Sequence, residues 1–319
     1  TSTGAAGAEG RRAASLRAAR ILAVVVFAGA ALAAALGCFA MEPRGPETAP
    51  SLWGGETRLD GRGVYRRDSV SGALQVRAND AVTLVAALPL LAAAFFLARR
   101  GSKGGKLLLA GAFGYFLYTY ASLAFGLVFN EYFLLYVGLF TTSLLGFTFA
   151  MLSLDVEALE EGSARYPRRS GAAFSLAVAL FLGAAWIGGR VLPALAPGGA
   201  ARILEHYHTL YIQVLDLGVV APAGLLAAWW LLRRDPRGYP LGAVLFVKGA
   251  TLGLAVTTMG FSQIAAGEEV PAPLLAGFAL LTAAAVVLAV LAVRSAGFAP
   301  ALAADDAAAR AGRERPSAR

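Results

Sequence analysis

Five polar residues with helical spacing are the first place in this sequence where chemistry could occur. Arg202, His206, Thr209, Gln213 and Asp216 follow one another at intervals of four, three, four and three positions. This spacing predicts one face of a single helix. An acid at the deep end of such a face is costly in lipid unless it is paired or hydrated. The stripe predicts the wall of an outward-facing polar cavity in which Asp216 binds a proton or a cation; a hydrogen-bonded seam between helices is the alternative.

A second acid, Asp80, lies close to Gln75, Asn79 and Thr83 at the start of another apolar segment. Carboxylates at matching positions of two related helices could converge on one proton or cation, because two like charges at close range favour protonation of one of them. The alternative is that Asn79 and Asp80 cap their helix, since Asx side chains accept hydrogen bonds from the free N–H groups of a first turn.

Three further residues could complete a cavity of this kind. Lys248 is a basic residue within a long apolar segment, and it could pair with Asp216 or extend its side chain toward the membrane surface. Tyr115 and Tyr118 lie in the middle of another segment, where a phenol needs a hydrogen-bond partner. The predicted solute-binding residues are Asp216, Gln213, His206, Asp80, Tyr118, Tyr115 and Lys248.

Metal and cofactor chemistry find no support in the residue spacing. His206 and His208 are two positions apart and point to different faces of a helix, and Cys38 is the single cysteine. We therefore expect no metal site and no cofactor. No G-x-S-x-G, H-E-x-x-H or phosphate-loop pattern occurs either.

The composition decides which elements carry these residues. The chain has 319 residues, of which 58% are apolar and 15% charged, and its mean hydropathy is +0.63. Soluble domains average about 25% charged residues, so the composition excludes an ordinary soluble enzyme and a disordered chain. The net charge of +8 would raise the question of nucleic acid. The basic residues, however, flank apolar segments, so we expect a lipid bilayer and no nucleic acid as the partner.

Eight apolar segments are long enough to cross roughly 30 Å of membrane hydrocarbon as helices. Asn130 and Glu131 alone interrupt the third and fourth, which predicts a tight helical hairpin. The predicted spans are 21–40, 81–98, 107–129, 132–154, 171–193, 209–232, 239–265 and 271–293. The fold class is therefore all-α, a polytopic bundle of eight transmembrane helices.

The positions of the basic residues predict the orientation of the bundle. Most of the 28 Lys and Arg lie in the two tails and in the second, fourth and sixth connections, and basic residues near span ends are retained in the cytoplasm. Both termini are thus predicted to be cytoplasmic. Heavy use of Arg, Ala and Gly indicates a bacterium with a GC-rich genome, and hence its inner membrane. Cleavage and lipidation at Cys38 are the alternative to an uncleaved first helix.

An internal repeat predicts how the spans are grouped. Residues 89–100 and 223–234 each contain two adjacent aromatic residues followed by Arg-Arg, and each segment follows an acid. We predict two parallel four-span repeats whose common axis is normal to the membrane. The repeats cover 21–154, including an external loop at 41–80, and 171–294, with a cytoplasmic linker at 155–170 and disordered tails at 1–20 and 295–319.

Four short segments carry a resemblance to a known family. Residues 75–84, 115–120, 133–136 and 215–218 resemble segments of a family of bacterial multi-pass inner-membrane proteins with no assigned activity. The resemblance covers most of residues 60–265, and it implies no fold, activity or ligand.

The sequence favours a secondary transporter or a solute-binding permease whose partner is a small solute or a proton. A non-catalytic component of a complex with another membrane protein is the alternative. A second alternative is an enzyme for lipid- or polyprenyl-linked substrates that uses Glu56, Asp60 or Asp68 of the predicted external loop, although catalysis is not the expected role.

Overall fold

The computed structural model describes residues 2–43, 45–161 and 165–297. Within these ranges eight helical segments are long and apolar enough to cross a membrane, which confirms the predicted all-α class with eight membrane-length helices. These segments are Ala6–Phe39, Val70–Arg99, Lys103–Gly126, Phe133–Leu152, Arg168–Leu195, Tyr211–Arg233, Gly238–Ala265 and Ala272–Ser295. The chain is therefore a multi-pass membrane protein.

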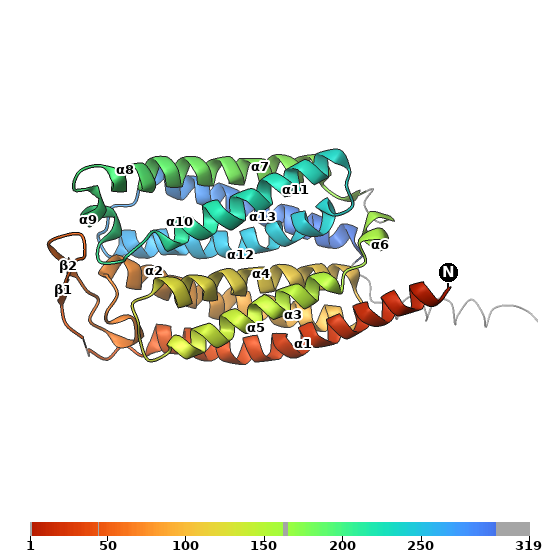
Figure 1. Cartoon of the computed structure of the whole chain (residues 1–319), viewed down its shortest axis with the longest axis horizontal. Coiled ribbons are helices and arrows are strands. Elements are labelled where there is room, and N and C mark those ends of the chain that lie inside the picture. Colours follow the sequence, from red (N-terminus) through yellow and green to blue (C-terminus); the bar gives the residue numbers. More distant parts are fainter. Residues whose placement is uncertain (1, 44, 162–164, 298–319) are drawn as a thin grey trace, which may run out of the picture.

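The first four membrane segments form one group, here called the first bundle (Figure 1). Its helices are α1 (Ser2–Phe39), α2 (Val70–Val82), η2 (Thr83–Ala87), α3 (Leu88–Arg99), α4 (Lys103–Gly126) and α5 (Phe133–Leu152). The segment η2 is a π-helix that joins α2 to α3 without a break. Pro89 follows η2. A proline lacks the backbone N–H that an α-helical turn would donate, so the π-helical turn lies where one backbone hydrogen bond is lost.

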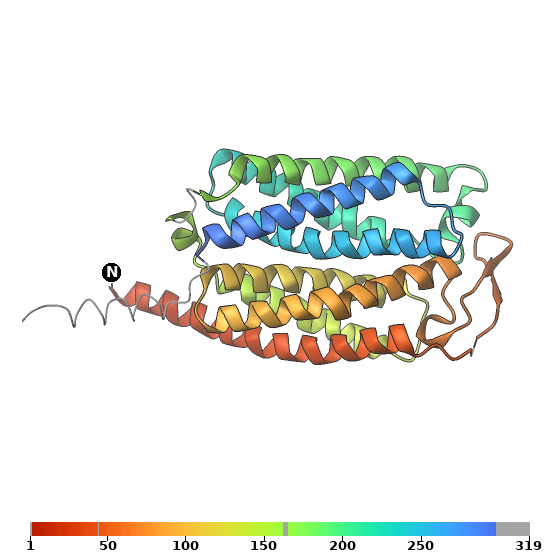
Figure 2. The ribbon, with the colours of Figure 1, turned by 180° about the vertical axis from the view of Figure 1, so that it is seen from behind.

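The last four membrane segments form the second bundle, which lies beside the first (Figure 2). Its helices are α7 (Arg168–Gly183), η4 (Ala184–Val191), α8 (Leu192–Leu195), α10 (Tyr211–Leu215), η5 (Asp216–Val220), α11 (Ala221–Arg233), α12 (Gly238–Ala265) and α13 (Ala272–Ser295). Here η4 and η5 are π-helical. Pro193 and Pro222 follow them, as Pro89 follows η2.

The two bundles have the same order of neighbouring helices. In the first, α1 packs on α2 and α3, α3 on α4, α4 on α5, and α5 on α1. In the second, α7 packs on α11, α11 on α12, α12 on α13, and α13 on α7. At the interface between the bundles, α12 of the second packs on both α4 and α2 of the first.

Small residues let α4 pack closely against its neighbours. A side chain added at Gly111 would overlap Val247 of α12, and one at Gly146 of α5 would overlap the ring of Phe113. Close approach of backbones at glycine is a usual means of helix association in lipid. As a result α4 is the most buried of the eight membrane segments.

The connections gather at the two ends of the bundles. One end, here called the loop end, carries the hairpin of β1 (Thr48–Pro50) and β2 (Glu56–Arg58), the short helices η1 (Gly63–Tyr65) and α9 (Gly199–Leu204), and the turns at 127–132 and 266–271 (Figure 1). The strands pair antiparallel, with Ala49 opposite Thr57. The opposite end, the tail end, carries the N-terminal turns of α1 and α6 (Val156–Glu161).

Two expectations about helix ends differ from the structure. Residues 2–20 belong to α1, whereas the sequence predicts a disordered tail there. Asp80 lies well inside α2, whose N-cap is Ser69, with its side chain accepting from Gly72 N–H. The capping interpretation of Asn79 and Asp80 is therefore wrong. The predicted C-terminal tail at 295–319 falls largely outside the described residues.

Candidate functional site

A cavity of about 290 Å³ lies between the two bundles and within the second. Its walls come from α2, α4, α7, η4, α10, η5, α12 and α13. At the loop end it begins near Ser71 and Glu205, and it reaches Lys248 and Thr282 inside the bundle. Lys248 is about 15 Å along α12 from Gly238, at 1.5 Å per residue, so the cavity extends to the middle of the membrane segments.

The Asp216 carboxylate forms part of the cavity wall and is held by two hydrogen bonds. Tyr118 of α4 donates its hydroxyl to Oδ1 at 2.8 Å, and Trp186 of η4 donates its indole N–H to Oδ2 at 2.7 Å. Asp216 opens the π-helical segment η5, and its residue is 5% exposed. Donors from two other spans therefore fix the orientation of this acid.

The Lys248 ammonium group lies on the same wall. Its Nζ is 4.0 Å from the centroid of the Tyr118 ring, and Lys248 is 8% exposed. Over the part of the chain that the structure describes, no acceptor lies within hydrogen-bond distance of this nitrogen and no carboxylate lies within 4.0 Å. Tyr118 thus stands between a buried anion and a buried cation, touching both.

The cavity has both polar and apolar lining residues besides this charged pair. Gln213, one turn before Asp216, lines the cavity and is 9% exposed, and the hydroxyl-bearing Ser122 lines it from α4. The apolar wall consists of Phe181, Leu252, Val256, Phe278 and Leu281. The arrangement can bind a small molecule that has one polar end and one apolar end.

The predicted polar stripe does not lie on one helix. Helix α9 ends at Leu204, Glu205 has a positive φ of 54°, and α10 begins only at Tyr211. Arg202 therefore lies on α9 and His206 in the loop after it, and neither continues the face that carries Gln213 and Asp216. Ser51 stabilises this loop by donating its hydroxyl to the Glu205 carbonyl oxygen at 2.5 Å.

His206 lies outside the cavity wall. Its Nε2 is 3.0 Å from the carbonyl oxygen of Arg67, so it joins the second bundle's loop to the segment before α2. Thr209 does line the cavity at the loop end. Thr209, Gln213 and Asp216 thus line the cavity, as the stripe predicted. The five residues do not, however, form one face of a single helix.

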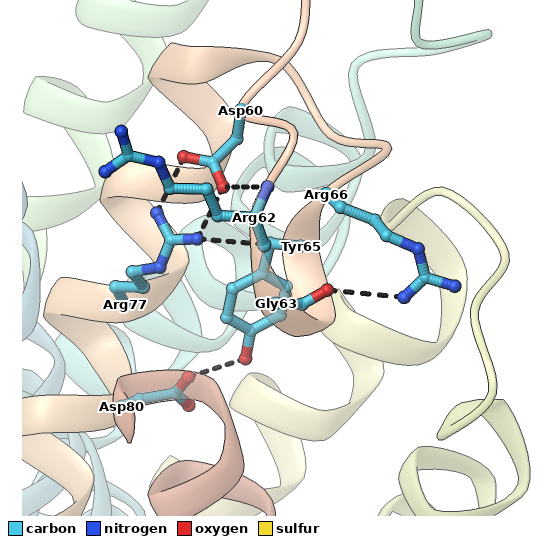
Figure 3. Close-up of polar contacts among 7 residues, drawn as sticks. All are labelled: Asp60, Arg62, Gly63, Tyr65, Arg66, Arg77 and Asp80. Atoms are coloured by element: carbon cyan, nitrogen blue, oxygen red, sulfur yellow. Dashed lines mark hydrogen bonds and ion pairs between the residues drawn. The ribbon is translucent and has the colours of Figure 1, made fainter. Parts of the chain in front are cut away.

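Asp80 belongs to a different cluster, inside the first bundle (Figure 3). Tyr65 of η1 donates its hydroxyl to Asp80 Oδ2 at 2.5 Å, and both residues are nearly inaccessible, at 1% and 3% exposure. A side chain added at Gly37 of α1 would overlap both of these oxygen-bearing groups. Asp80 and Asp216 therefore have separate partners in separate bundles, and the structure does not bring them to one shared ion.

Above this cluster, Arg77 holds the segment that precedes α2. Its guanidinium donates to both carboxylate oxygens of Asp60, at 2.7 and 2.5 Å, and its Cζ lies 5.9 Å from the Tyr65 ring centroid (Figure 3). The bidentate geometry is the strong form of this ion pair.

Tyr115 also lies away from the cavity. Its hydroxyl is 2.7 Å from Thr83 Oγ1 and donates to Asn79 Oδ1 at 3.2 Å. It is fully buried, so it connects α4 to α2 inside the protein.

Two contributors were not predicted from the sequence. Trp186 donates one of the two hydrogen bonds to Asp216. The sequence contained an indication of this role, because an indole N–H in the middle of an apolar segment needs an acceptor. Asp68, considered only as an external acid, is 1% exposed. Its Oδ1 accepts from Val128 N–H and from the Tyr207 hydroxyl, both at 3.1 Å.

Asp68 therefore connects the two bundles at the loop end. Val128 precedes α5 in the first bundle, whereas Tyr207 lies in the loop before α10 of the second. Burial raises the pKa of Asp68 to about 7, against the lowering effects of the bonds from Val128 and Tyr207. Its Oδ2 is buried, and no hydrogen-bond partner for it occurs among the described residues.

In the described ranges no group of three or more His, Cys, Asp and Glu side chains is placed to hold a metal ion. The single cysteine, Cys38, directs its Sγ toward the Arg77 carbonyl oxygen at 3.8 Å.

Comparisons with protein-family models, curated proteins and solved structures gave no match. The family resemblance of the four short segments therefore stays a prediction.

Proposed function

We propose that this multi-pass membrane protein binds a small solute in the cavity beside Asp216 and Lys248 and moves it across the membrane as a secondary transporter. The observation that carries the proposal is a carboxylate and an ammonium group that both line one cavity in mid-membrane without forming a direct ion pair. Buried charges are expensive in lipid. A purely structural pair would be expected to close to direct contact.

The arrangement of the bundles supports movement as well as binding. Both bundles have the same order of helices, and the π-helical segments η2 and η5 occur at corresponding places before a proline. This supports the predicted parallel repeat. Transporters built from repeats bind their substrate at the repeat interface and alternate access by rocking one repeat against the other. The cavity lies next to the α4–α12 interface, where such rocking would open and close it.

The second candidate is an accessory component of a membrane complex, with Asp216 as a structural acid. The observation that favours it is that each Asp216 oxygen already accepts a hydrogen bond. The enzyme alternative gains less support. Asp60 is paired with Arg77 and Asp68 is buried between the bundles, so neither carboxylate is free to approach a lipid-linked substrate.

The test is solute flux in proteoliposomes that contain the purified full-length protein and the internal pH dye pyranine. Panels of small carboxylates, amino acids, amines and sugars are added outside, and both internal pH and radiolabel uptake are followed. We expect uptake from one class, and we expect Asp216→Asn to abolish any coupled proton movement while the variant still inserts. Glu268→Gln is the matched control, because it removes the same charge from an exposed loop-end turn.

Uptake at the level of empty liposomes for every class, together with a stoichiometric partner in the purified sample, would replace transport by the accessory role. Unchanged coupling in Asp216→Asn would show that this acid is structural.

A further inference from the structure

The geometry points to a small organic monocarboxylate as the solute, bound by Lys248 while Asp216 takes up one proton. This inference rests on the proposed function, because it names the chemical class that the same cavity would take. It is argued from the unequal way in which the two buried charges are satisfied.

The positive group is the one that lacks a partner. Within the described chain the Lys248 nitrogen has only the face of the Tyr118 ring beside it, at 4.0 Å from the centroid. A cation–π contact gives a buried ammonium part of its stabilisation, but all three N–H donors still need acceptors. A carboxylate entering the cavity would supply an anionic acceptor at this point.

The negative group is already satisfied. Both Asp216 oxygens accept hydrogen bonds, from Tyr118 of α4 and Trp186 of η4. A cationic solute would have to bind an engaged carboxylate next to Lys248, whose like charge opposes it. The cavity therefore discriminates against amines and in favour of carboxylates.

Charge balance then requires a proton. In the empty cavity the charges of Asp216 and Lys248 cancel, and adding a carboxylate would leave one uncompensated negative charge in a medium of low dielectric constant. Protonation of Asp216 restores neutrality and turns one of its oxygens into a donor that can face the incoming carboxylate.

Among the described residues that line the middle of the cavity, Asp216 is the one acid. The charged or titratable groups that face Asp216 are Tyr118 on α4 and Lys248 on α12, and Trp186 contributes a non-titrating N–H. Tyr211 of α10 faces Tyr118. Arg190 and Glu205 line the cavity farther toward the loop end.

The remaining walls fit the rest of such a molecule. Lys248 is the one cation that the described residues place in the middle of the cavity, where it accommodates one carboxylate, and the lining also includes Phe181, Leu252, Phe278 and other apolar groups. The volume of about 290 Å³ lies at the small end of ligand sites, which usually run from about 300 to 1,000 Å³. A short aliphatic or single-ring acid matches both properties.

The proposal is tested by isothermal titration calorimetry of the purified full-length protein with acetate, butyrate and benzoate. Butyramide, butylamine and 4-aminobutyrate are the matched probes. Titrations at one pH in two buffers of different ionisation enthalpy give the number of protons taken up. We expect butyrate or benzoate to bind with uptake of about one proton, because one added negative charge must be compensated. We expect no binding of butyramide or butylamine.

Two variants assign the roles. Lys248→Met should weaken carboxylate binding by about 10- to 100-fold, the usual cost of a charge-assisted hydrogen bond, whereas Lys248→Arg should retain most of it. Lys106→Met is the control, because Lys106 lies on α4 outside the cavity wall. Asp216→Asn resembles the protonated acid, so it should still bind butyrate but without proton uptake.

The possible outcomes distinguish this inference from the proposed transport function. Binding of carboxylates with proton uptake but without flux in proteoliposomes would support this inference and refute transport. Uptake of an amine or a sugar with no carboxylate binding would support transport and overturn the inference. Binding of 4-aminobutyrate without proton uptake, or failure of all three carboxylates to bind, would also overturn it, whatever the variants do.

Discussion

The hydrogen bond between Tyr65 and Asp80 allows the clearest stability prediction, because both groups are almost completely buried. The oxygen–oxygen distance of 2.5 Å is in the range of a charge-assisted O–H···O⁻ bond, and we take an ionised Asp80 as the premise of the prediction. Tyr65→Phe removes the one side-chain donor that the described residues offer to this carboxylate. The variant leaves a buried charge unsatisfied and changes little in volume.

The magnitude follows from the kind of bond that is lost. A hydrogen bond to a charged group contributes about 1.5–3 kcal/mol, and an unsatisfied buried charge adds to its loss. We therefore expect Tyr65→Phe to lower the free energy of unfolding by about 2–3 kcal/mol. This corresponds to roughly a 30- to 150-fold change in the folding equilibrium, since 1.4 kcal/mol is tenfold.

A matched control is available in the second bundle. Tyr166 is also buried, and it donates its hydroxyl to the Tyr239 carbonyl oxygen at 3.1 Å. That acceptor is neutral, so Tyr166→Phe should cost only about 1 kcal/mol. Asp80→Asn keeps an acceptor for Tyr65 and removes a buried charge, so it should be tolerated or mildly stabilising.

The assay is reversible unfolding of the purified protein in mixed detergent micelles, followed by circular dichroism, for the three single variants and for the double variant Tyr65→Phe/Asp80→Asn. The double variant should recover at least about 1 kcal/mol relative to the sum of the singles, because residues in direct contact are energetically coupled. Equal costs for Tyr65→Phe and Tyr166→Phe, with additive single variants, would refute the reasoning and show that Asp80 is neutral in the folded protein.

Three other predictions concern the loop end, the helix packing and the topology. Burial raises the pKa of Asp68 from 3.8 to about 7, so the unfolded chain loses this proton first and stability should fall by a few kcal/mol as the pH rises from about 4 to 7. Asp68→Asn should abolish that decline in pH-dependent unfolding curves, and an unchanged decline would assign it to other groups. On α5, Gly146→Ala would overlap the Phe113 ring and should lower the stability of the protein by about 1–3 kcal/mol. Gly138→Ala meets no atom within 4 Å, so it should be neutral or stabilising by up to about 1 kcal/mol. Equal effects of the two variants in thermal denaturation would contradict the packing. In a cysteine-free background, Ser51→Cys should react with an impermeant maleimide in intact cells and Lys103→Cys, at an exposed position of the tail end, should not; the reverse labelling would invert the predicted orientation.

The number and approximate limits of the membrane helices could be predicted from the sequence alone. Their length follows from the thickness of the hydrocarbon layer and the need to satisfy every backbone group internally, and both conditions act on each segment separately. The same local argument identified Asp216, Lys248 and Tyr118 as unusual, because a polar group in lipid is costly wherever its helix packs. The predicted cytoplasmic ends rest on charge distribution and remain predictions.

The grouping of these polar residues depended on tertiary structure. Helical spacing joined His206 to Asp216, but α10 begins only at Tyr211, so His206 lies in the loop before the helix that leads to Asp216. Repeat symmetry joined Asp80 to Asp216, but Tyr65 folds back from the loop end to bond Asp80 inside the first bundle. Trp186 reaches Asp216 from another span. Spacing along one helix determines only which face a residue occupies, whereas the partner of a buried charge depends on which distant segment packs against that face.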